Sequence, residues 1–134
     1  MSGDSEAILP RRLAICRWLL RVYRLQVTVF GKNLSVEARK ALSPSAYQEI
    51  LLDLYEARLE NRQVYQSCLA PGGPPATAHR QAARLEALGA VSRSPDTSDH
   101  RRQNVMLTED MQAVLDHFMD AVEAATREFA ARSR

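Results

Sequence analysis

The chain has 134 residues, of which 46% are apolar and 25% are charged, a composition that favours one globular domain with a real core. No stretch approaches the roughly 18 apolar residues of a membrane helix, and the polar, acidic start lacks a signal-peptide layout. We therefore expect a cytoplasmic protein without a membrane segment. Cys16 and Cys68 are too few for a disulfide framework and too far apart for a CxxC metal site.

The net charge of +2 is distributed unevenly along the chain. Residues 1–60 carry nine basic and seven acidic side chains, residues 61–108 carry six and three, and residues 109–134 carry three and six. The resulting balances are +2, +3 and −3. A basic middle before an acidic tail indicates that the middle meets an anionic partner, although charge alone fits a solvated surface of uneven sign better.

Apolar spacing predicts a long helix over residues 11–30, after a flexible segment over residues 1–10. One line of apolar side chains has heptad-like spacing and forms a first seam: Leu13, Cys16, Leu20, Tyr23, Val27 and Phe30. A second line runs beside it: Ile15, Leu19, Val22 and Val29. One seam can face the chain's own core, so two seams indicate a second surface for a partner.

A second long helix is predicted over residues 109–134. Thr108 suits its N-cap, and Glu109 and Asp110 suit the positive end of the helix. Its apolar seam again has heptad-like spacing: Met111, Leu115, Phe118, Val122, Ala125 and Phe129. Because one small domain rarely needs such seams at both ends, we predict a homodimer built from residues 11–42 and 109–134. The alternative is that the two helices pack only on each other within one chain.

Residues 43–108 are expected to form the domain between these helices. Ser43 and Pro44 suit the cap and first position of a scaffold helix, which has a buried face: Tyr47, Ile50, Leu51, Leu54 and Arg58. A short apolar helix over residues 64–70 then runs into the sequence PGGPP, which forces a turn. A further helix is predicted from Pro75 to Leu88, where Gly89 ends it.

The helix over residues 75–88 has two different sides. Its apolar side consists of Ala78, Ala82, Leu85 and Leu88. The opposite side carries small residues and cations, with no acid before Glu86. Small residues let a helix approach a duplex closely, and arginine donates to guanine or phosphate. The candidate DNA contacts on this helix are Thr77, His79, Arg80 and Arg84. The alternative is an ordinary amphipathic helix with a solvated basic face.

A β-ribbon is predicted directly after this helix. The strand AVSR, a long charged loop and the alternating strand QNVMLT follow one another. Helix, turn, helix and ribbon in this order make a winged helix-turn-helix. The expected fold is therefore mainly α with a small β-ribbon (α+β), flanked by long N- and C-terminal dimerisation helices.

The stretch RLEALGAVSRSPDTSDHRRQNVMLTED resembles the MarR-type (multiple antibiotic resistance regulator) winged-helix transcription factors, a likeness that extends over about residues 43–120. It rests on a Leu-Glu pair, a Gly-hydrophobic-Val step, an Arg, an Asp-x-x-Asp-x-Arg wing and a strand that ends in Leu-Thr: Leu85, Glu86, Gly89, Ala90, Val91, Arg93, Asp96, Asp99, Arg101, Val105, Leu107 and Thr108. It implies a recognition helix over residues 75–88 in the major groove and a wing over residues 93–103 at the minor groove or backbone.

The resemblance also implies roles for the wing residues and the partners. Arg93, Arg101 and Arg102 would contact DNA, while Asp96 and Asp99 would orient the arginines. The partners would be double-stranded DNA, a second copy of the chain and a small-molecule effector, bound between the dimer helices and the DNA-binding lobe.

The sequence also bears on three other functions. An enzyme is not expected, because Asp96, Asp99 and His100 share one loop and no second cluster completes a catalytic or metal site; no cofactor is expected either. A winged-helix protein-interaction module without strong DNA binding is one alternative. A redox-sensing regulator with Cys16 as its reactive thiol is another, since neighbouring arginines would favour the thiolate. The apolar seam instead favours a packed core thiol for Cys16, and Cys68 is interpreted in the same way.

Overall fold

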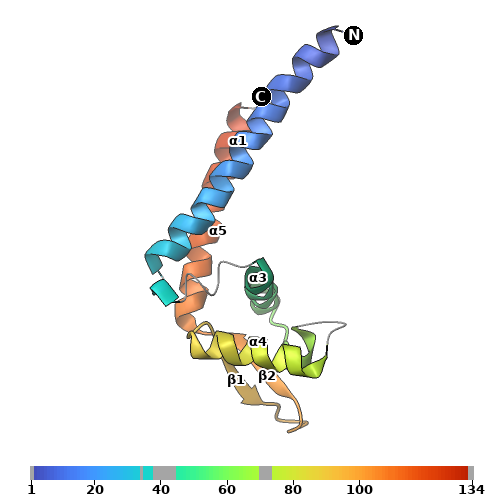
Figure 1. Cartoon of the computed structure of the whole chain (residues 1–134), viewed down its shortest axis with the longest axis vertical. Coiled ribbons are helices and arrows are strands. Elements are labelled where there is room, and N and C mark those ends of the chain that lie inside the picture. The colour runs from blue at the N-terminus through green and yellow to red at the C-terminus, as the bar shows by residue number, and fades with distance from the viewer. Residues whose placement is uncertain (1, 34, 38–44, 70–73, 133–134) are drawn as a thin grey trace. The chain divides into compact units, whose positions relative to one another are not determined.

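The computed structural model describes residues 2–33, 35–37, 45–69 and 74–132 (Figure 1). Its elements in chain order are α1 (Ser2–Asn33), α3 (Ser45–Leu59), the 3-10 helix η1 (Gln66–Cys68), α4 (Pro75–Ala87), β1 (Val91–Pro95), β2 (Gln103–Leu107) and α5 (Glu109–Arg132). They fall into two compact units, residues 1–33 with 116–134 and residues 34–115. The predicted cap at Ser43 and Pro44 lies outside the described residues.

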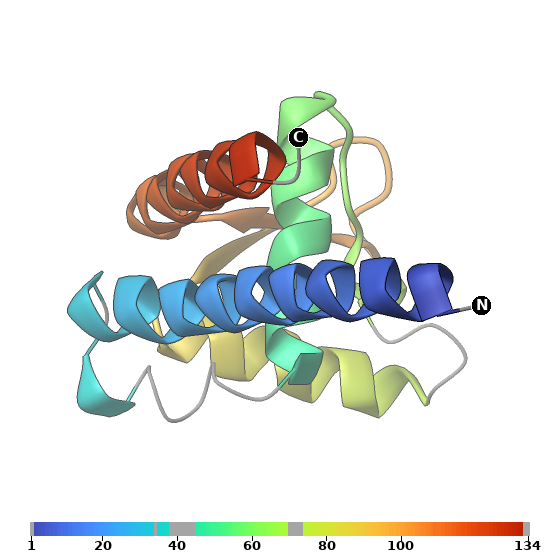
Figure 2. The same ribbon diagram turned by 90° about the horizontal axis from the view of Figure 1, so that it is seen from above.

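The first unit consists of α1 and the C-terminal part of α5, which run side by side in opposite directions (Figures 1 and 2). The rings of Trp18 and Phe129 lie 5.7 Å apart between centroids, and Arg21 forms an ion pair with Glu128. Helix α1 begins at Ser2, within the segment expected to be flexible, and continues through Pro10 although proline removes a backbone donor there. No described helix is long and apolar enough to cross a membrane.

The two predicted seams have different environments. On α5 the seam is largely buried, and its fully or nearly fully buried members are Met111, Leu115, Phe118 and Ala125. On α1 the described members of the first seam are exposed instead: Leu13, Cys16, Leu20, Tyr23 and Val27. Helix α1 turns another face, which includes Trp18, toward α5, and the described members of its first seam are left largely exposed.

Both cysteines are exposed in the single chain, so their interpretation as thiols packed in its own core is wrong. Cys16 lies on the first seam of α1, which faces solvent because the helix packs through its other side. Cys68 lies in η1, a three-residue turn that buries none of its side chains.

The second unit is the predicted winged helix. Its core is formed by apolar side chains from α3, α4, both strands and the start of α5, of which the largest fully buried ones are Leu51, Leu85, Leu115, Val91 and Val105. The predicted apolar side of α4 is confirmed at Ala78, Ala82 and Leu85, which are buried, while Leu88 is partly buried and caps the end of the helix. Because burial of this side fixes the rotation of α4 about its axis, it also fixes which side chains face outward.

The ribbon pairs β1 with β2 in antiparallel register, from Val91 opposite Leu107 to Pro95 opposite Gln103. The segment before η1 lies along the other side of β2, since the amide of Val105 donates to the carbonyl of Val64 at 2.9 Å. This pairing shortens the helix that was predicted over residues 64–70. Extended residues cannot also be helical, and only the 3-10 turn of η1 remains in the described part of that segment.

Helix α4 ends in a Schellman motif around Gly89. The amide of Gly89 donates to the carbonyl of Glu86 at 3.0 Å, and the amide of Ala90 donates to the carbonyl of Leu85 at 2.9 Å. The predicted cap of α5 joins this point, because the Thr108 hydroxyl donates to the Gly89 carbonyl at 2.7 Å and accepts from the Met111 amide at 3.2 Å. One threonine thus starts α5 and ties it to the end of the candidate recognition helix.

Replacing Gly89 with alanine should lower the free energy of unfolding by about 1 kcal/mol. Gly89 has φ of +76°, which disfavours a Cβ, while no atom lies within 4 Å of the place where that Cβ would stand. The penalty is therefore one of backbone conformation and not of a clash. Gly89→Asn should be milder, because asparagine tolerates the left-handed region better. Urea unfolding compares the three proteins, and equal losses for both variants would contradict this explanation.

Candidate nucleic-acid interface

The outward side of α4 is a basic surface made by His79, Arg80 and Arg84, all of which are exposed. Thr77, the remaining candidate on this helix, is half-buried beside them. The first turn of α4 contains no acidic residue and no side chain caps its start, so the partial positive charge of the helix end remains uncompensated there. An anion can approach this end of α4 without meeting a carboxylate of the helix.

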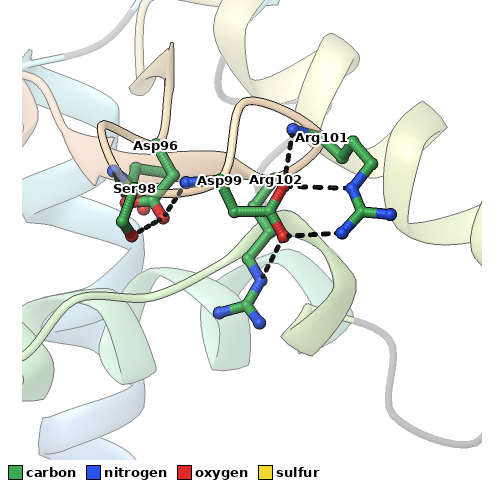
Figure 3. Close-up of polar contacts among 6 residues, drawn as sticks. Asp96, Ser98, Asp99, Arg101 and Arg102 are labelled. Atoms are coloured by element: carbon green, nitrogen blue, oxygen red, sulfur yellow. Dashed lines mark hydrogen bonds and ion pairs between the residues drawn. The ribbon is translucent and has the colours of Figure 1, made fainter.

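Asp96 organises the base of the wing loop. It is only 2% exposed, and its carboxylate accepts hydrogen bonds from the Ser98 hydroxyl at 2.8 Å and the Asp99 amide at 3.2 Å (Figure 3). The same carboxylate accepts from the Asn104 side chain at 3.5 Å. The hydrogen bond from Ser98 is the main cause that lowers the pKa of Asp96. These hydrogen bonds hold the loop itself, and the nearby positive charge of Arg102 also lowers the pKa of Asp96, so its expected role in orienting arginines stays a prediction.

Asp99 does contact both wing arginines, which approach its carboxylate from different sides (Figure 3). Its Oδ1 accepts from the backbone amide and from Nε of Arg101, each at 3.1 Å, and Nε of Arg102 lies 3.6 Å from Oδ2. The hydrogen bond from the Arg101 side chain is the first cause that lowers the pKa of Asp99. The carboxylate thus remains ionised and positions two cations.

The two wing arginines are differently placed. The Arg101 side chain is 92% exposed, whereas that of Arg102 is 55% exposed and lies over the ring of Tyr65, 5.0 Å from its centroid. Arg101 is therefore the cation that this loop presents most fully to solvent. Arg102 also joins the wing to the segment that runs along β2.

Arg93 is engaged within the protein, and its side chain is 19% exposed. Its guanidinium donates to Oε1 of Glu86 at 2.9 Å from Nη2, and its backbone amide donates to Oε2 of the same carboxylate at 3.1 Å. These bonds lower the pKa of Glu86, with the side-chain hydrogen bond as the largest cause. Nη1 of Arg93 donates to Gln66 at 3.0 Å. Arg93 thus joins β1, α4 and η1, and it presents less of its charge to solvent than the arginines on α4 and the wing tip.

The side chains of this unit also bear on a metal site and on a ligand cavity. Among the described residues, no three His, Cys, Asp or Glu side chains gather as metal ligands. A cavity of about 370 Å³ lies between the end of α3 and β2, lined on its basic side by Arg58 and Arg62. Arg58 donates to the Leu107 carbonyl at 3.3 Å, and Arg62 forms ion pairs with Glu56 and Glu60. Both guanidinium groups already have partners, so this cavity offers no free cation to an anionic ligand.

Replacing Asp96 with asparagine should lower the stability at neutral pH, because the ionised acceptor of three wing hydrogen bonds is lost. The pKa of Asp96 is depressed in the folded state, so its contribution is complete above the ordinary value of 3.8 and disappears as the pH falls through the folded pKa. The difference between wild type and Asp96→Asn should therefore shrink below pH 3.8.

Urea unfolding at several pH values between about 3 and 7 measures this difference. Asp120→Asn, an exposed carboxylate on α5, is the matched control and should show no such pH-dependent gap. A gap for Asp96→Asn that stays constant down to pH 3 would contradict the role of the ionised carboxylate.

The sequence matches no protein-family model and no curated protein. Solved structures resemble it more clearly. The YusO protein from Bacillus subtilis aligns with a TM-score of 0.61 and 15% identity over 95% of this chain and 83% of its own. RV1404 from Mycobacterium tuberculosis aligns with a TM-score of 0.61 and 15% identity over 96% of this chain and 80% of its own. A mutant of MepR from S. aureus aligns with a TM-score of 0.56 and 15% identity over 90% of this chain and 79% of its own.

At these identities the likeness shows the fold. The chain has the winged-helix fold of these proteins, mainly α with a small antiparallel ribbon, as the resemblance to MarR-type regulators implied. The fold prediction is therefore confirmed. The roles of the individual site residues depend on the geometry of this chain alone.

Proposed function

We propose that this protein is a sequence-specific DNA-binding transcriptional regulator. The proposal rests mainly on one observation: the second unit exposes two separate groups of basic side chains. One is the outward side of α4 with Arg80 and Arg84, and the other is Arg101 at the wing, held by Asp99. A helix of this kind fits the major groove, and a wing arginine fits the flanking backbone or minor groove.

The acids of this region support the same proposal, because they are used internally. Glu86 pairs with Arg93, Asp96 holds the wing loop, and Asp99 positions the two wing arginines. None of the three is left as an isolated surface charge that would repel phosphate. The net positive charge of residues 61–108 is therefore carried by side chains that face solvent, and such exposed positive charge attracts DNA.

We further propose that the regulator acts as a homodimer through α1. The first seam of this helix is apolar and exposed along five described positions, and a second copy offers an identical face that excludes water from it. A two-fold dimer would also present two copies of α4, which matches a DNA site with two symmetric halves. By the MarR-type resemblance, a small-molecule effector would then control DNA binding.

Selection of bound duplexes from a random library tests this function. We expect enrichment of a two-fold symmetric sequence whose half-site centres lie about one helical turn, or about 10 base pairs, apart. Affinity for the selected site should fall steeply as salt is raised, since bound phosphates release counterions. No enrichment, with an affinity insensitive to salt, would instead support a winged-helix module that binds another protein.

A further inference from the structure

A chain of hydrogen bonds runs beside α4, from Glu86 near its end to His79 near its start, through side chains of β1 and η1. It begins at Glu86, passes through Arg93 of β1 and Gln66 of η1, and reaches His79. The contacts are 2.9 Å from Arg93 to Glu86, 3.0 Å from Arg93 to Gln66, and 3.4 Å between Nε2 of Gln66 and Nδ1 of His79. His79 itself is exposed. The chain therefore connects a partly buried ion pair to a ring that can reach a bound molecule.

The ion pair fixes the direction of every bond in this chain. A guanidinium only donates, so the Gln66 atom that faces Arg93 must be the carbonyl oxygen Oε1. The amide group is thereby prevented from turning over, and the atom that faces His79 is the NH2 group, which also only donates. Nδ1 of His79 must accept, and in a neutral imidazole the proton then lies on Nε2.

We infer that His79 determines sequence specificity by donating from Nε2 to an acceptor on a base edge, with Gln66 and Arg93 as its positioning residues. The inference rests on the proposed DNA-binding function. Guanine N7 and O6, adenine N7 and thymine O4 are acceptors in the major groove, whereas the amino groups of cytosine and adenine are donors. A donating ring favours a purine N7, guanine O6 or thymine O4 at the base that it meets and disfavours the amino group of cytosine.

The first variant is His79→Ala, assayed against every single base-pair substitution of the selected DNA site. We expect the preference for an acceptor-bearing base to fall about 10-fold at one position in each half-site, since one hydrogen bond to a base edge is lost. Preferences at the other positions should be unchanged.

The second variant is Gln66→Met, which removes the amide and keeps a side chain of similar length. It should weaken the preference at the same base pair as His79→Ala and at no other. In a protein that already carries His79→Ala, Gln66→Met should have no further effect on base preference, because its influence passes through the ring. Gln63→Met is the matched control, since Gln63 is exposed and lies before the segment that carries Gln66.

The outcomes separate the inference from the function on which it rests. If the wild-type protein selects no DNA sequence, both are overturned. If it selects a sequence and His79→Ala changes no base preference, the inference fails and the proposed function stands. An effect of Gln66→Met that persists unchanged beside His79→Ala, or that appears equally with Gln63→Met, overturns the positioning role of Gln66.

Discussion

An Arg80→Ala protein should bind its selected DNA site about 30-fold more weakly than wild type, or weaker still. Arg80 is exposed on the side of α4 opposite the buried Ala78 and Ala82, so a helix in the major groove would bring its guanidinium to a base edge or a phosphate. One such contact is worth about 1–3 kcal/mol, and a dimer loses two. A total of about 2 kcal/mol or more corresponds to this change in Kd.

Two further variants make the Arg80→Ala measurement specific. Arg101→Ala removes a wing cation that is held by a neighbouring carboxylate, and it should weaken binding uniformly across sequences while reducing the salt dependence. Arg127→Ala removes an exposed arginine of α5 that pairs with Glu123 on the same helix, and both residues lie in the first unit, whereas α4 belongs to the second. This variant should leave the affinity for DNA almost unchanged. A loss for Arg127→Ala as large as that for Arg80→Ala would show that net charge alone sets the affinity.

Local sequence patterns predicted the parts of the fold that depend on near neighbours in the chain. The apolar spacing of Ala78, Ala82 and Leu85 fixed the buried side of α4, and the structure has the same side buried. Thr108 was predicted as the cap of α5 and accepts the Met111 amide as expected. These features depend on residues three or four positions apart, so periodicity and capping rules are sufficient for them.

Contacts between distant residues could not be read in the same way. Arg93 was predicted to contact DNA from its place in a motif, yet its side chain is occupied by Glu86 and by Gln66, which lies 27 positions away. Nothing in the sequence near Gln66 indicates that its amide meets both Arg93 and His79. The sequence showed no sign, for the same reason, that Tyr65 pairs with Asn104 of β2, because this pairing follows from tertiary structure and not from local pattern.

The α1 seams show a third situation, in which the apolar lines were recognised but the side of the helix that packs on α5 was not. Two apolar lines indicated two contact surfaces, but neither line as predicted is the side that packs on α5, since Ile15 and Leu19 of the second line are 46% and 54% exposed. In the structure Trp18 contacts Phe129, while the line that contains Cys16 is exposed. Heptad spacing reports that a face is apolar, whereas the partner of that face depends on the shapes and sizes of all side chains around the helix.

A protein with Leu20→Glu and Val27→Glu should be a monomer at micromolar concentration. These side chains are 44% and 61% exposed in the single chain, so the substitutions leave the packing of α1 against α5 intact. In a symmetric dimer the same positions would bury four carboxylates without partners, and each buried unpaired charge costs several kcal/mol. The change should therefore abolish association while helical content by circular dichroism stays at the wild-type level.

Sedimentation velocity on the wild type, the double variant and Thr28→Glu measures whether each protein is a monomer or a dimer. Thr28 is exposed on the polar side of α1 beside Arg24, so Thr28→Glu adds a carboxylate to the same helix outside the seam and should remain dimeric. The monomeric protein should also lose most of its affinity for a two-half-site duplex, because each copy would have to bind its half-site independently. If the double variant stayed dimeric with full DNA affinity, the first seam of α1 would not be the dimer interface. If it lost helical content instead, this face would belong to the fold of the single chain.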